Sequence, residues 1–355
     1  MASPPIPPEV FEPFLDKLVD VHCHPSDAAE ESNLEQVASE ISQLQVGQLC
    51  IMSSSLSSQE ITEKLFNLQP SKIIPAFGLH PWFCATVSIS NPVDRSSHYC
   101  GLFGENEKQK QWVEDHIHLL PDPVNFNEFL SHLKLRLESE PTSLLGEVGL
   151  DKAFSFQFKL SDGSFLKSGL KIPIDHQLAV LEAQLDLAVR LSKNVSLHGV
   201  HCQDQIIQLL QRLEKRWGAK LTGAKQLSKR QRKAILSTES KPSAIDDQEH
   251  GIHICWHSAF VSVEVLKRAV KLFPNTLYFS FAFVLFENKN ISKLHDLIKY
   301  TPNDRLLVES DWSDQPKLID QQIIRIIEII LEVKGWTLER CIHQLEINWK
   351  NFQLD

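Results

Sequence analysis

Eight short apolar runs, most of them separated by segments with helical periodicity, constrain the fold of this chain more than any other feature. They are KLVDVHCH (17–24), VGQLCIMSS (46–54), KIIPAFGLHP (72–81), SLLGEVGLD (143–151), NVSLHGV (194–200), GIHICWHS (251–258), NTLYFSFA (275–282) and RLLVESDW (305–312). Strands that alternate with helices predict a parallel sheet with right-handed crossovers. Eight such units predict a closed (β/α)8 TIM barrel, and a doubly wound open sheet is the alternative that periodicity leaves open.

The clearest helical segment is 175–192, DHQLAVLEAQLDLAVRLS, with Pro173 and Asp175 at its expected start. Its apolar residues Leu178, Leu181, Leu185 and Ala188 fall on one helical face. Helices are also expected over 262–273, 288–300 and 317–334.

The length of 355 residues fits either two domains or one large α/β barrel with insertions. We expect a Pro-rich N-terminal segment at 1–16 and a single TIM-barrel domain over 17–355. Insertions after strands three, four and five fall at about 84–124, 152–172 and 212–250. The second, rich in aromatics and glycine turns, predicts a lid or hairpin over the site. Loops this long are usually functional or disordered, so the insertions are candidate surfaces for a protein partner.

Composition limits the partners and the compartment. The formal charge of −9 argues against capture of nucleic acid by the whole surface, although it leaves a local basic groove open. Seven cysteines without a C-x-x-C pair indicate reduced thiols inside a cell. The start MASPPIPPEVFEPF has no secretory pattern, and no apolar run is long enough for a membrane span. We therefore expect a cytoplasmic or nuclear protein, or both.

The first strand ends in an H-x-H pattern, His22 and His24. Side chains alternate along a strand, so both imidazoles should point to the same face. Asp20 shares that parity but lies one step deeper. The alternative is a pair of inert, hydrogen-bonded histidines at an exposed strand end.

Four other strands supply matching groups at their predicted ends, namely Glu147, His198, His257 and Asp311. Active sites of TIM barrels lie at the carboxyl ends of the strands. Four histidines and two carboxylates suit Zn²⁺, Mn²⁺, Co²⁺ or Fe²⁺, and carboxylates also admit Mg²⁺. Six ligands exceed what one tetrahedral ion needs. We therefore expect two ions, bridged by a carboxylate and a water at a spacing of about 3.5–4 Å.

Several positions have competing interpretations. Glu147 lies between two glycines and also fits a turn acid, and His201 competes with His198. His253 has the parity of His257, but four residues at about 3.3 Å each place it about 13 Å deeper, near the barrel floor.

Other polar and aromatic residues near strand ends fit supporting roles. Glu309 lies one layer below Asp311, where an acid is costly unless paired, so it is expected to orient a ligand. His80 fits a second layer around the metals or a substrate contact. Trp82 and Trp312 are expected either to wall the pocket or to pack under a loop.

Taken together, these motifs resemble the TatD family of metal-dependent hydrolases, in family order over most of 17–335. VDVHCH resembles its D-x-H-x-H, GLHP its G-x-H-P, and GEVGLD its G-E-x-G-L-D. HQLAVLEAQLDLAVRLSKNVSLH, WHSAF and LYFSFA…PNDRLLVESDW resemble the segments around its later strands. Any one of these motifs alone is weak evidence for the family, but six motifs in the family's order are specific for it.

The resemblance implies an amidohydrolase-like TIM barrel that binds two divalent ions, drawn from Mg, Mn, Zn and Co, and hydrolyses a substrate. Its implied ligands are His22, His24, Glu147, His198, His257 and Asp311. Several members of the family release nucleotides from DNA, commonly from a 3′ end, so DNA or RNA is the implied substrate. Asp311 would accept a proton from water, and Glu147 would hold the second ion or the water. The basic stretch 212–233 would contact a nucleic-acid backbone, or else form a solvated charged helix.

The chain also departs from the family pattern, as a divergent, fungal-type branch would. HGVHC lacks the Arg and Asp that usually follow the strand-five histidine, and Phe281 replaces a glycine. SDWSD lacks the usual proline, and GLDKAF lacks the usual aromatic pair. A missing Arg is a missing bidentate phosphate contact. Two other functions therefore stay open: hydrolysis of another ester or an amide, such as aminoacyl-tRNA, and a barrel that serves as a protein-interaction scaffold.

Overall fold

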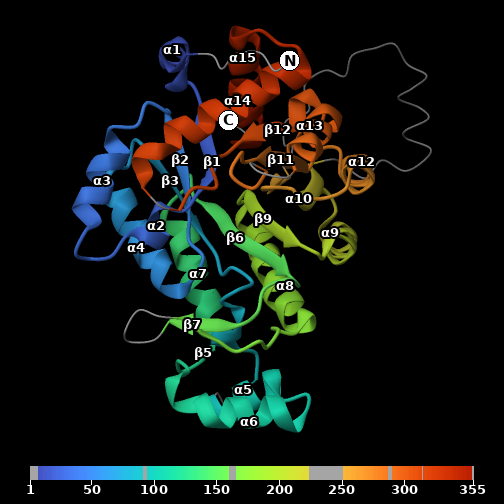
Figure 1. Cartoon of the computed structure of the whole chain (residues 1–355). Helices are drawn as coiled ribbons and strands as arrows, with labels where there is room; N and C mark the ends of the chain where they lie inside the picture. Colours follow the sequence, from blue (N-terminus) through green and yellow to red (C-terminus); the bar gives the residue numbers. More distant parts are fainter. Residues whose placement is uncertain are drawn as a thin grey trace, which may run out of the picture.

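A single sheet of eight parallel strands organises the molecule (Figure 1). The computed structural model describes residues 7–90, 94–159, 165–223, 251–286, 290–313 and 315–353. The strands, in sheet order, are β1 (Val19–Cys23), β2 (Gln48–Met52), β3 (Ile73–Phe77), β6 (Leu144–Asp151), β9 (Val195–Val200), β10 (Ile254–Trp256), β11 (Leu277–Phe281) and β12 (Leu306–Val308). Each of the eight predicted apolar runs therefore contains one strand.

The sheet curves round until its first and last strands meet. Just beyond β12, the Asp311 amide donates to the carbonyl of His22 at 3.0 Å. The His24 amide donates to the carbonyl of Trp312 at 2.8 Å. These bonds join the carboxyl ends of β1 and β12 into a nearly closed ring. The (β/α)8 barrel is thus confirmed, and the doubly wound open sheet is wrong.

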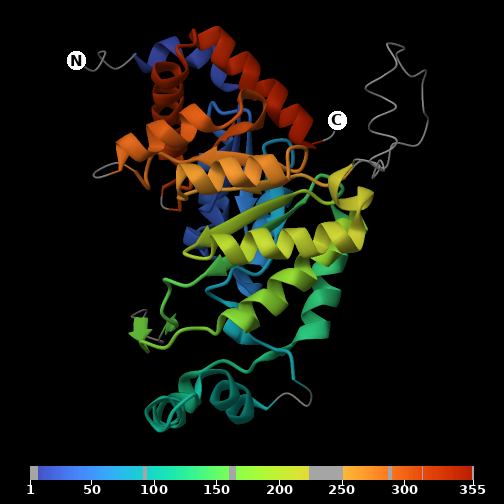
Figure 2. The ribbon, with the colours of Figure 1, turned by 90° about the vertical axis from the view of Figure 1, so that its right-hand side faces the viewer.

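Helices surround the strands on the outside (Figures 1 and 2). They are α2 (Pro25–Ala28), α3 (Leu34–Ser42), α4 (Leu56–Leu68), α7 (Phe126–Ser139), α8 (Ile174–Leu191), α9 (Gln203–Trp217), α10 (Ala219–Thr222), α12 (Val263–Leu272), α13 (Ile291–Tyr300), α14 (Ile319–Lys334) and α15 (Leu338–Gln353), with α1 (Glu12–Leu15) before β1. Pro173 caps α8 and Asp175 lies in its first turn, as predicted. Leu181, Leu185 and Ala188 are buried on the predicted face.

The buried apolar side chains form two clusters, one outside and one inside the ring of strands. The larger packs the helices against the outside of the strands, and the smaller fills the interior. Phe352 of α15 belongs to the interior cluster and is 1% exposed. Its carbonyl accepts hydrogen bonds from the side chains of Asn194 (2.6 Å) and His253 (2.9 Å). The last helix thereby closes the floor of the barrel, so the open end is the one with the carboxyl ends of the strands.

The insertions carry structure of their own. Residues 84–124 hold β4 (Val87–Ser88), α5 (Arg95–Phe103), α6 (Glu107–His116) and the start of β5 (Val124–Asn125). In both views α5 and α6 lie at the opposite end of the molecule from α14 and α15. Within 152–172, β7 (Gln157–Lys159) and β8 (Phe165–Lys167) pair as an antiparallel hairpin. Of the third insertion, 224–250 lies outside the described residues. In the described part of the chain, every helix is too short or too polar to traverse a bilayer.

Candidate active site

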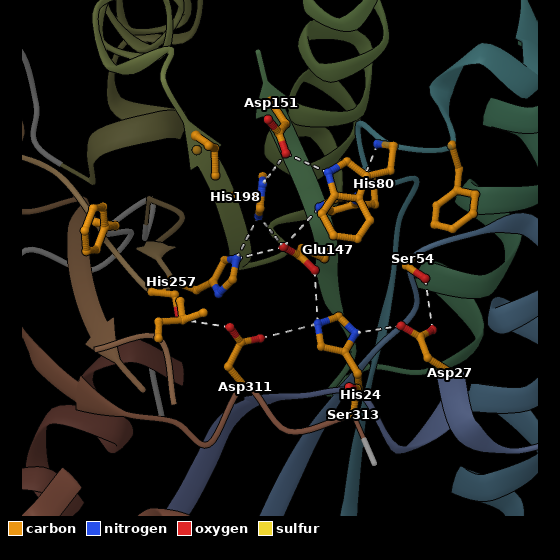
Figure 3. Close-up of a pocket in the computed structure, with 17 residues that line it drawn as sticks. His24, Asp27, Ser54, His80, Glu147, Asp151, His198, His257, Asp311 and Ser313 are labelled. Atoms are coloured by element: carbon orange, nitrogen blue, oxygen red, sulfur yellow. Dashed lines mark hydrogen bonds and ion pairs between the residues drawn. The ribbon is translucent and has the colours of Figure 1, made fainter. Parts of the chain in front are cut away.

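The six predicted ligands come together at the open end of the barrel, in a cavity of about 400 Å³. Figure 3 shows the side chains of His24, His198, His257 and Asp311 pointing toward the centrally placed Glu147. The 17 lining residues of the cavity include all of these, and His22 lies fully buried beneath them. Five strands thus deliver six groups to one place, although the groups are scattered over 290 positions of sequence from His22 to Asp311.

Glu147 is the centre of the cluster because its two oxygens face different histidines. Oε2 lies 3.5 Å from His22 Nε2 and 3.1 Å from His24 Nε2. Oε1 lies 2.8 Å from His198 Nδ1 and 2.7 Å from His257 Nε2. A carboxylate with distinct partners on each oxygen has the arrangement of a group that bridges two ligand sets.

His80 joins the same cluster more directly than we predicted. Its Nε2 lies 3.4 Å from Oε1 of Glu147, and its ring meets that of His198 edge-on at 4.4 Å. His80, Glu147 and His198 therefore form a group whose ligand atoms all lie within 4.8 Å of one another. The same holds for His22, His24 and Glu147, and for His22, His257 and Glu309.

The exact positions of these residues on their strands differ from the prediction. Glu147 and His198 lie within β6 and β9, not at their ends, because both strands continue to Asp151 and Val200. Gly149 permits this extension, because a Cβ there would lie 2.1 Å from the carbonyl oxygen of His198 on the paired strand. By contrast, His24 and His257 lie one residue beyond their strands, and Asp311 lies three residues beyond β12.

The H-x-H pattern converges as the parity argument predicted. The Nε2 atoms of His22 and His24 lie 3.0 Å apart, although His24 has left the strand and caps α2. Outer partners hold each ring, since Nδ1 of His22 lies 2.7 Å from Ser196 Oγ. Nδ1 of His24 lies 3.3 Å from Asp27 Oδ2. With Nδ1 engaged outside, both rings turn Nε2 toward the cavity.

Asp311 completes the cluster from a strained backbone. Its φ of 50° lies in the left-handed region, which is uncommon for residues other than glycine and often marks functional sites. Oδ1 lies 3.8 Å from His22 Nε2 and 3.7 Å from His24 Nε2. Oδ2 lies 3.2 Å from Ser258 Oγ. Burial raises the pKa of Asp311 to about 6, and the charge of Glu309 contributes.

Glu309 lies below this layer, as predicted. It is fully buried and accepts hydrogen bonds from the Ser258 amide (2.7 Å), the Ser258 hydroxyl (2.5 Å) and the Ser280 hydroxyl. Its Oε1 lies 3.7 Å from Nδ1 of His257. Glu309 therefore supports both His257 and, through Ser258, Asp311. Of the two positions expected for Trp312, the pocket wall is not the one observed, because its indole donates to the Gln315 carbonyl at 3.1 Å and the residue does not line the cavity.

Sequence reasoning missed Asp151, which lines the cavity beside His198. Its Oδ2 accepts from Trp82 Nε1 at 2.6 Å and lies 3.7 Å from His198 Nε2. The GEVGLD motif itself contains Asp151. The strand period offered a signal, since Asp151 shares the parity of Glu147.

The pKa shifts within the cluster run in both directions, because its carboxylates and imidazoles interact closely. Burial lowers the pKa of His22 to about 3, with help from His257, and lowers the pKa of His80 to about 4. Burial would raise the pKa of Glu147, but the surrounding histidines hold it well below its usual range. Burial would lower the pKa of His257, but Glu147 outweighs it and raises that pKa to about 10. Metals bind neutral imidazole and ionised carboxylate, so a cation bound here would displace protons from His24, His198 and His257, whose pKa values burial would lower but the neighbouring carboxylates raise.

The donor set of this cluster fits a divalent metal ion. Five imidazole nitrogens, from His22, His24, His80, His198 and His257, lie within 3.5 Å of the Glu147 oxygens. A carboxylate offers about four lone-pair sites, so it cannot accept a hydrogen bond from every one of these five rings. Ligand atoms bound to one ion at about 2.1 Å lie about 3 Å apart, close to the observed spacings. The donor set therefore fits divalent cations of the kind that imidazole and carboxylate bind.

His253 occupies the barrel floor, far from this cluster, and the contrast with His257 yields a prediction. His253 packs edge-on against Tyr278 at 5.0 Å, besides its hydrogen bond to Phe352. We expect His257→Ala to abolish hydrolytic activity. His253→Ala should retain activity but lower the free energy of unfolding by about 0.5–1.5 kcal/mol, because the Phe352 carbonyl loses one hydrogen bond and keeps the one from Asn194. Turnover and urea denaturation of both variants measure this, and the opposite pattern would contradict the assignment of the two histidines.

Comparison with known proteins agrees with the fold and the motifs. The family model for TatD related DNase matches residues 19–353. The chain is 31% identical over 353 residues to "Cut9-interacting protein scn1" of Schizosaccharomyces pombe, covering 95% of this chain and 99% of that protein. It is 24% identical over 351 residues to "Uncharacterized deoxyribonuclease YMR262W" of Saccharomyces cerevisiae, covering 96% and 99%.

Solved structures share the barrel at low identity. The TatD homolog YJJV of Escherichia coli superimposes with a TM-score of 0.57 at 18% identity, over 95% of this chain and 98% of that one. A TatD family hydrolase of Entamoeba histolytica gives 0.56 at 14% identity, over 94% and 97%. These likenesses concern the fold alone. Because the family model spans nearly the whole chain and the fission yeast relative exceeds 30% identity, the chain belongs to the TatD-related DNase family.

Proposed function

We propose that this protein is a divalent-metal-dependent hydrolase that cleaves phosphodiester bonds in DNA, as a TatD-like deoxyribonuclease. The observation that carries the proposal is the position of Glu147, with each oxygen among different histidines. His22, His24 and Asp311 would hold one ion beside Oε2. His198, His257 and His80 would surround the other beside Oε1. Two-ion sites of this type lower the pKa of a bound water and neutralise charge on a phosphoryl group.

The residues of the chain divide the remaining work. Asp311 would accept the proton of the attacking water, since its carboxylate lies beside both the first ligand set and the cavity. Ser258 and Glu309 would fix the orientation of Asp311 and His257. Asp27 and Ser196 would hold His24 and His22 with Nε2 inward. Such outer contacts also raise the basicity of ligating groups.

DNA is the proposed substrate because of the family and the name of the budding yeast relative. RNA is a second candidate with the same phosphodiester chemistry. In the described part of the basic stretch 212–233, both arginines are paired with carboxylates of α8. Arg212 and Arg216 pair with Glu182 at 3.1 and 2.5 Å, and Arg216 also pairs with Asp186. Residues 224–233 lie outside the described residues.

A second function, protein binding, has one observation in its favour. The fission yeast relative is named for its interaction with another protein, Cut9. The insertion with α5 and α6 extends from the barrel and offers a surface for such contact. A metal-bound protein without turnover on any substrate would favour this scaffold function. Hydrolysis of another ester or an amide, such as aminoacyl-tRNA, would use the same metal cluster. Either function suits a cytoplasmic or nuclear protein.

The first test concerns metal content. We expect one to two divalent ions per chain in protein purified without chelator. Replacing His22 and His24 together with Ala should remove at least one ion, because both rings turn Nε2 toward Oε2 of Glu147. Elemental analysis of both proteins measures this, with His253→Ala as a matched histidine control. Unchanged metal in the double variant would contradict the ligand assignment.

The second test is activity. We expect Mg²⁺- or Mn²⁺-dependent release of nucleotides from end-labelled single-stranded DNA, and its loss on chelation. Nucleotide release should be followed across Mg²⁺, Mn²⁺, Zn²⁺ and Co²⁺. If release stays at background with every ion while metal is bound, the nuclease proposal falls and the scaffold gains.

A further inference from the structure

Large apolar side chains surround the polar cluster at the mouth of the cavity. Trp82, Phe83, Phe260 and Leu285 line it and are 40%, 37%, 39% and 46% exposed. The described lining includes no Lys or Arg, whereas its carboxylates are Asp27, Glu147, Asp151 and Asp311. Exposed apolar groups gathered at a cavity mark a binding surface. Among the described lining residues, an anionic chain entering here would therefore meet apolar walls but no lysine or arginine.

Trp82 is fixed more firmly than an exposed side chain needs to be. Its Nε1 donates to Asp151 Oδ2 at 2.6 Å, and its ring stacks on Phe154 with centroids 4.7 Å apart and planes at 12°. The His80 ring meets it at 90° and 4.8 Å. Asp151 itself accepts from the Phe154 amide at 2.9 Å. A hydrogen bond and a stacked partner therefore hold the indole plane in one orientation beside the candidate metal ligands.

Two of the other apolar groups of the mouth, Phe260 and Leu285, lie across the barrel from Trp82. Trp82 follows β3, whereas Phe260 follows β10 and Leu285 follows β11. β3 and β11 are four places apart in the order of eight strands, so they stand on opposite sides. Phe260 already has a cation over its ring, since Lys293 Nζ lies 3.4 Å from the ring centre. Trp82 is thus the aromatic ring at the mouth that has a fixed orientation and, among the described residues, no cation over it. The polar cluster lies between Trp82 and the side of the cavity formed by Phe260 and Leu285.

We propose that Trp82 is the platform on which the terminal base of the nucleic-acid substrate stacks, and that this contact selects the substrate end. The inference rests on the proposed nuclease function. A cavity of about 400 Å³ falls within the range of small-ligand sites, about 300–1,000 Å³, so it admits one end of a strand. Every base has a flat face, and one stacked base is worth about 5- to 150-fold in affinity. Because the described lining holds no Lys or Arg, this stacking contact selects the substrate end, a role that a bidentate contact between Arg and phosphate would otherwise have.

A planar group fits this platform better than an aliphatic one. An aliphatic side chain binds any apolar wall and has no need for a ring held in one plane. The hydrogen bond to Asp151 fixes that plane, and Trp is the aromatic residue that offers an N–H donor together with a large face. An aromatic amino acid of an amide substrate is the competing occupant, and the experiment separates the two.

The experiment compares two single-stranded DNAs that differ only in the last residue, deoxyadenosine or an abasic analogue. We expect wild type to cleave the base-ended strand with a kcat/KM about 5- to 150-fold higher. Trp82→Ala should abolish this ratio. Trp82→Phe, which keeps a ring but loses the donor, should retain most of it. Trp112→Ala, on α6 and outside the cavity, is the matched control and should leave the ratio unchanged.

A binding measurement separates this inference from the nuclease proposal. In chelated protein, deoxyadenosine monophosphate should quench tryptophan fluorescence at lower concentration than deoxyribose 5-phosphate, and Trp82→Phe should remove that quenching. Quenching without DNA cleavage would contradict the nuclease proposal but support base stacking on Trp82.

Equal cleavage of both strands by wild type would contradict base stacking on Trp82 but support the nuclease proposal. Equal losses of the ratio in Trp82→Ala and Trp82→Phe would reduce Trp82 to positioning Asp151. Tighter binding of phenylalanine amide than of the nucleotide would overturn the base as occupant.

Discussion

Asp311→Asn is expected to lower turnover about 10²–10⁴-fold, which is the usual contribution of a general base. Asparagine keeps the shape of the side chain and one acceptor oxygen, but it carries no charge and cannot accept the proton of water. The hydrogen bond from Ser258 and the contacts near His22 and His24 can persist. Metal affinity should therefore fall modestly, while the chemical step loses its proton acceptor.

The measurement is turnover at saturating metal, with bound metal determined on the same samples. Glu309→Gln is the matched control, because Glu309 is an acid two residues away that contacts Ser258 and His257 but not the cavity. Loss of such an outer contact typically costs about 10–100-fold. Turnover of Asp311→Asn within a few-fold of wild type would remove Asp311 as the base, and Glu147 would be the next candidate.

The barrel was predictable because its signal is local. Each strand of a buried parallel sheet needs a short apolar run, and each crossover helix needs one apolar face, so both patterns are written in adjacent residues. The segment 175–192 illustrates this, since Pro173, Asp175 and the leucine stripe define α8 almost to the residue. The helices α5 and α6 escaped prediction because little of them is buried: in α6, only Val113 is buried. A mostly solvated helix leaves a weak periodic signal.

The ends of the strands were less predictable than their existence. We expected Glu147 and His198 at strand ends, but β6 and β9 pair onward through Gly149 and His198 to Asp151 and Val200. That extension depends on a close approach between two strands, which neither strand shows alone. The consequence is chemical as well as geometric, because it brings Asp151 beside His198.

The candidate ligands were predictable, and most of their supporting partners were not. Histidines and acids near the ends of buried strands are rare enough to notice one by one. Ser196 and Ser258 are ordinary residues in the sequence, yet one lies 2.7 Å from His22 and the other joins Glu309 to Asp311. Such roles arise only when the barrel closes. Trp82 and Trp312 show the same limit, since only the fold distinguishes the wall of the cavity from the residue beneath a loop.

Glu147→Gln is expected to remove at least one of the ions that the wild-type protein binds and to reduce turnover about 10³-fold or more. The two oxygens of Glu147 face different histidine sets, whereas glutamine offers one oxygen and an NH₂ group that donates and cannot bind a cation. The substitution also removes the negative charge at the centre of five imidazoles. An ion that stabilises developing charge contributes several kcal/mol, and each 1.4 kcal/mol is a factor of ten in rate.

Asp151→Asn is the control for Glu147→Gln. It shows whether the loss of metal comes from removing the carboxylate between the two histidine sets or from removing any acid near the metals. Asp151 lines the same cavity but approaches only the far nitrogen of His198, at 3.7 Å. Its replacement should keep both ions, with affinity lowered about 10–100-fold as for other outer partners. Elemental analysis at saturating metal, together with turnover, compares the two variants. If Glu147→Gln keeps two ions, then Glu147 is not the bridge, and the histidines must hold two separate ions without a shared carboxylate.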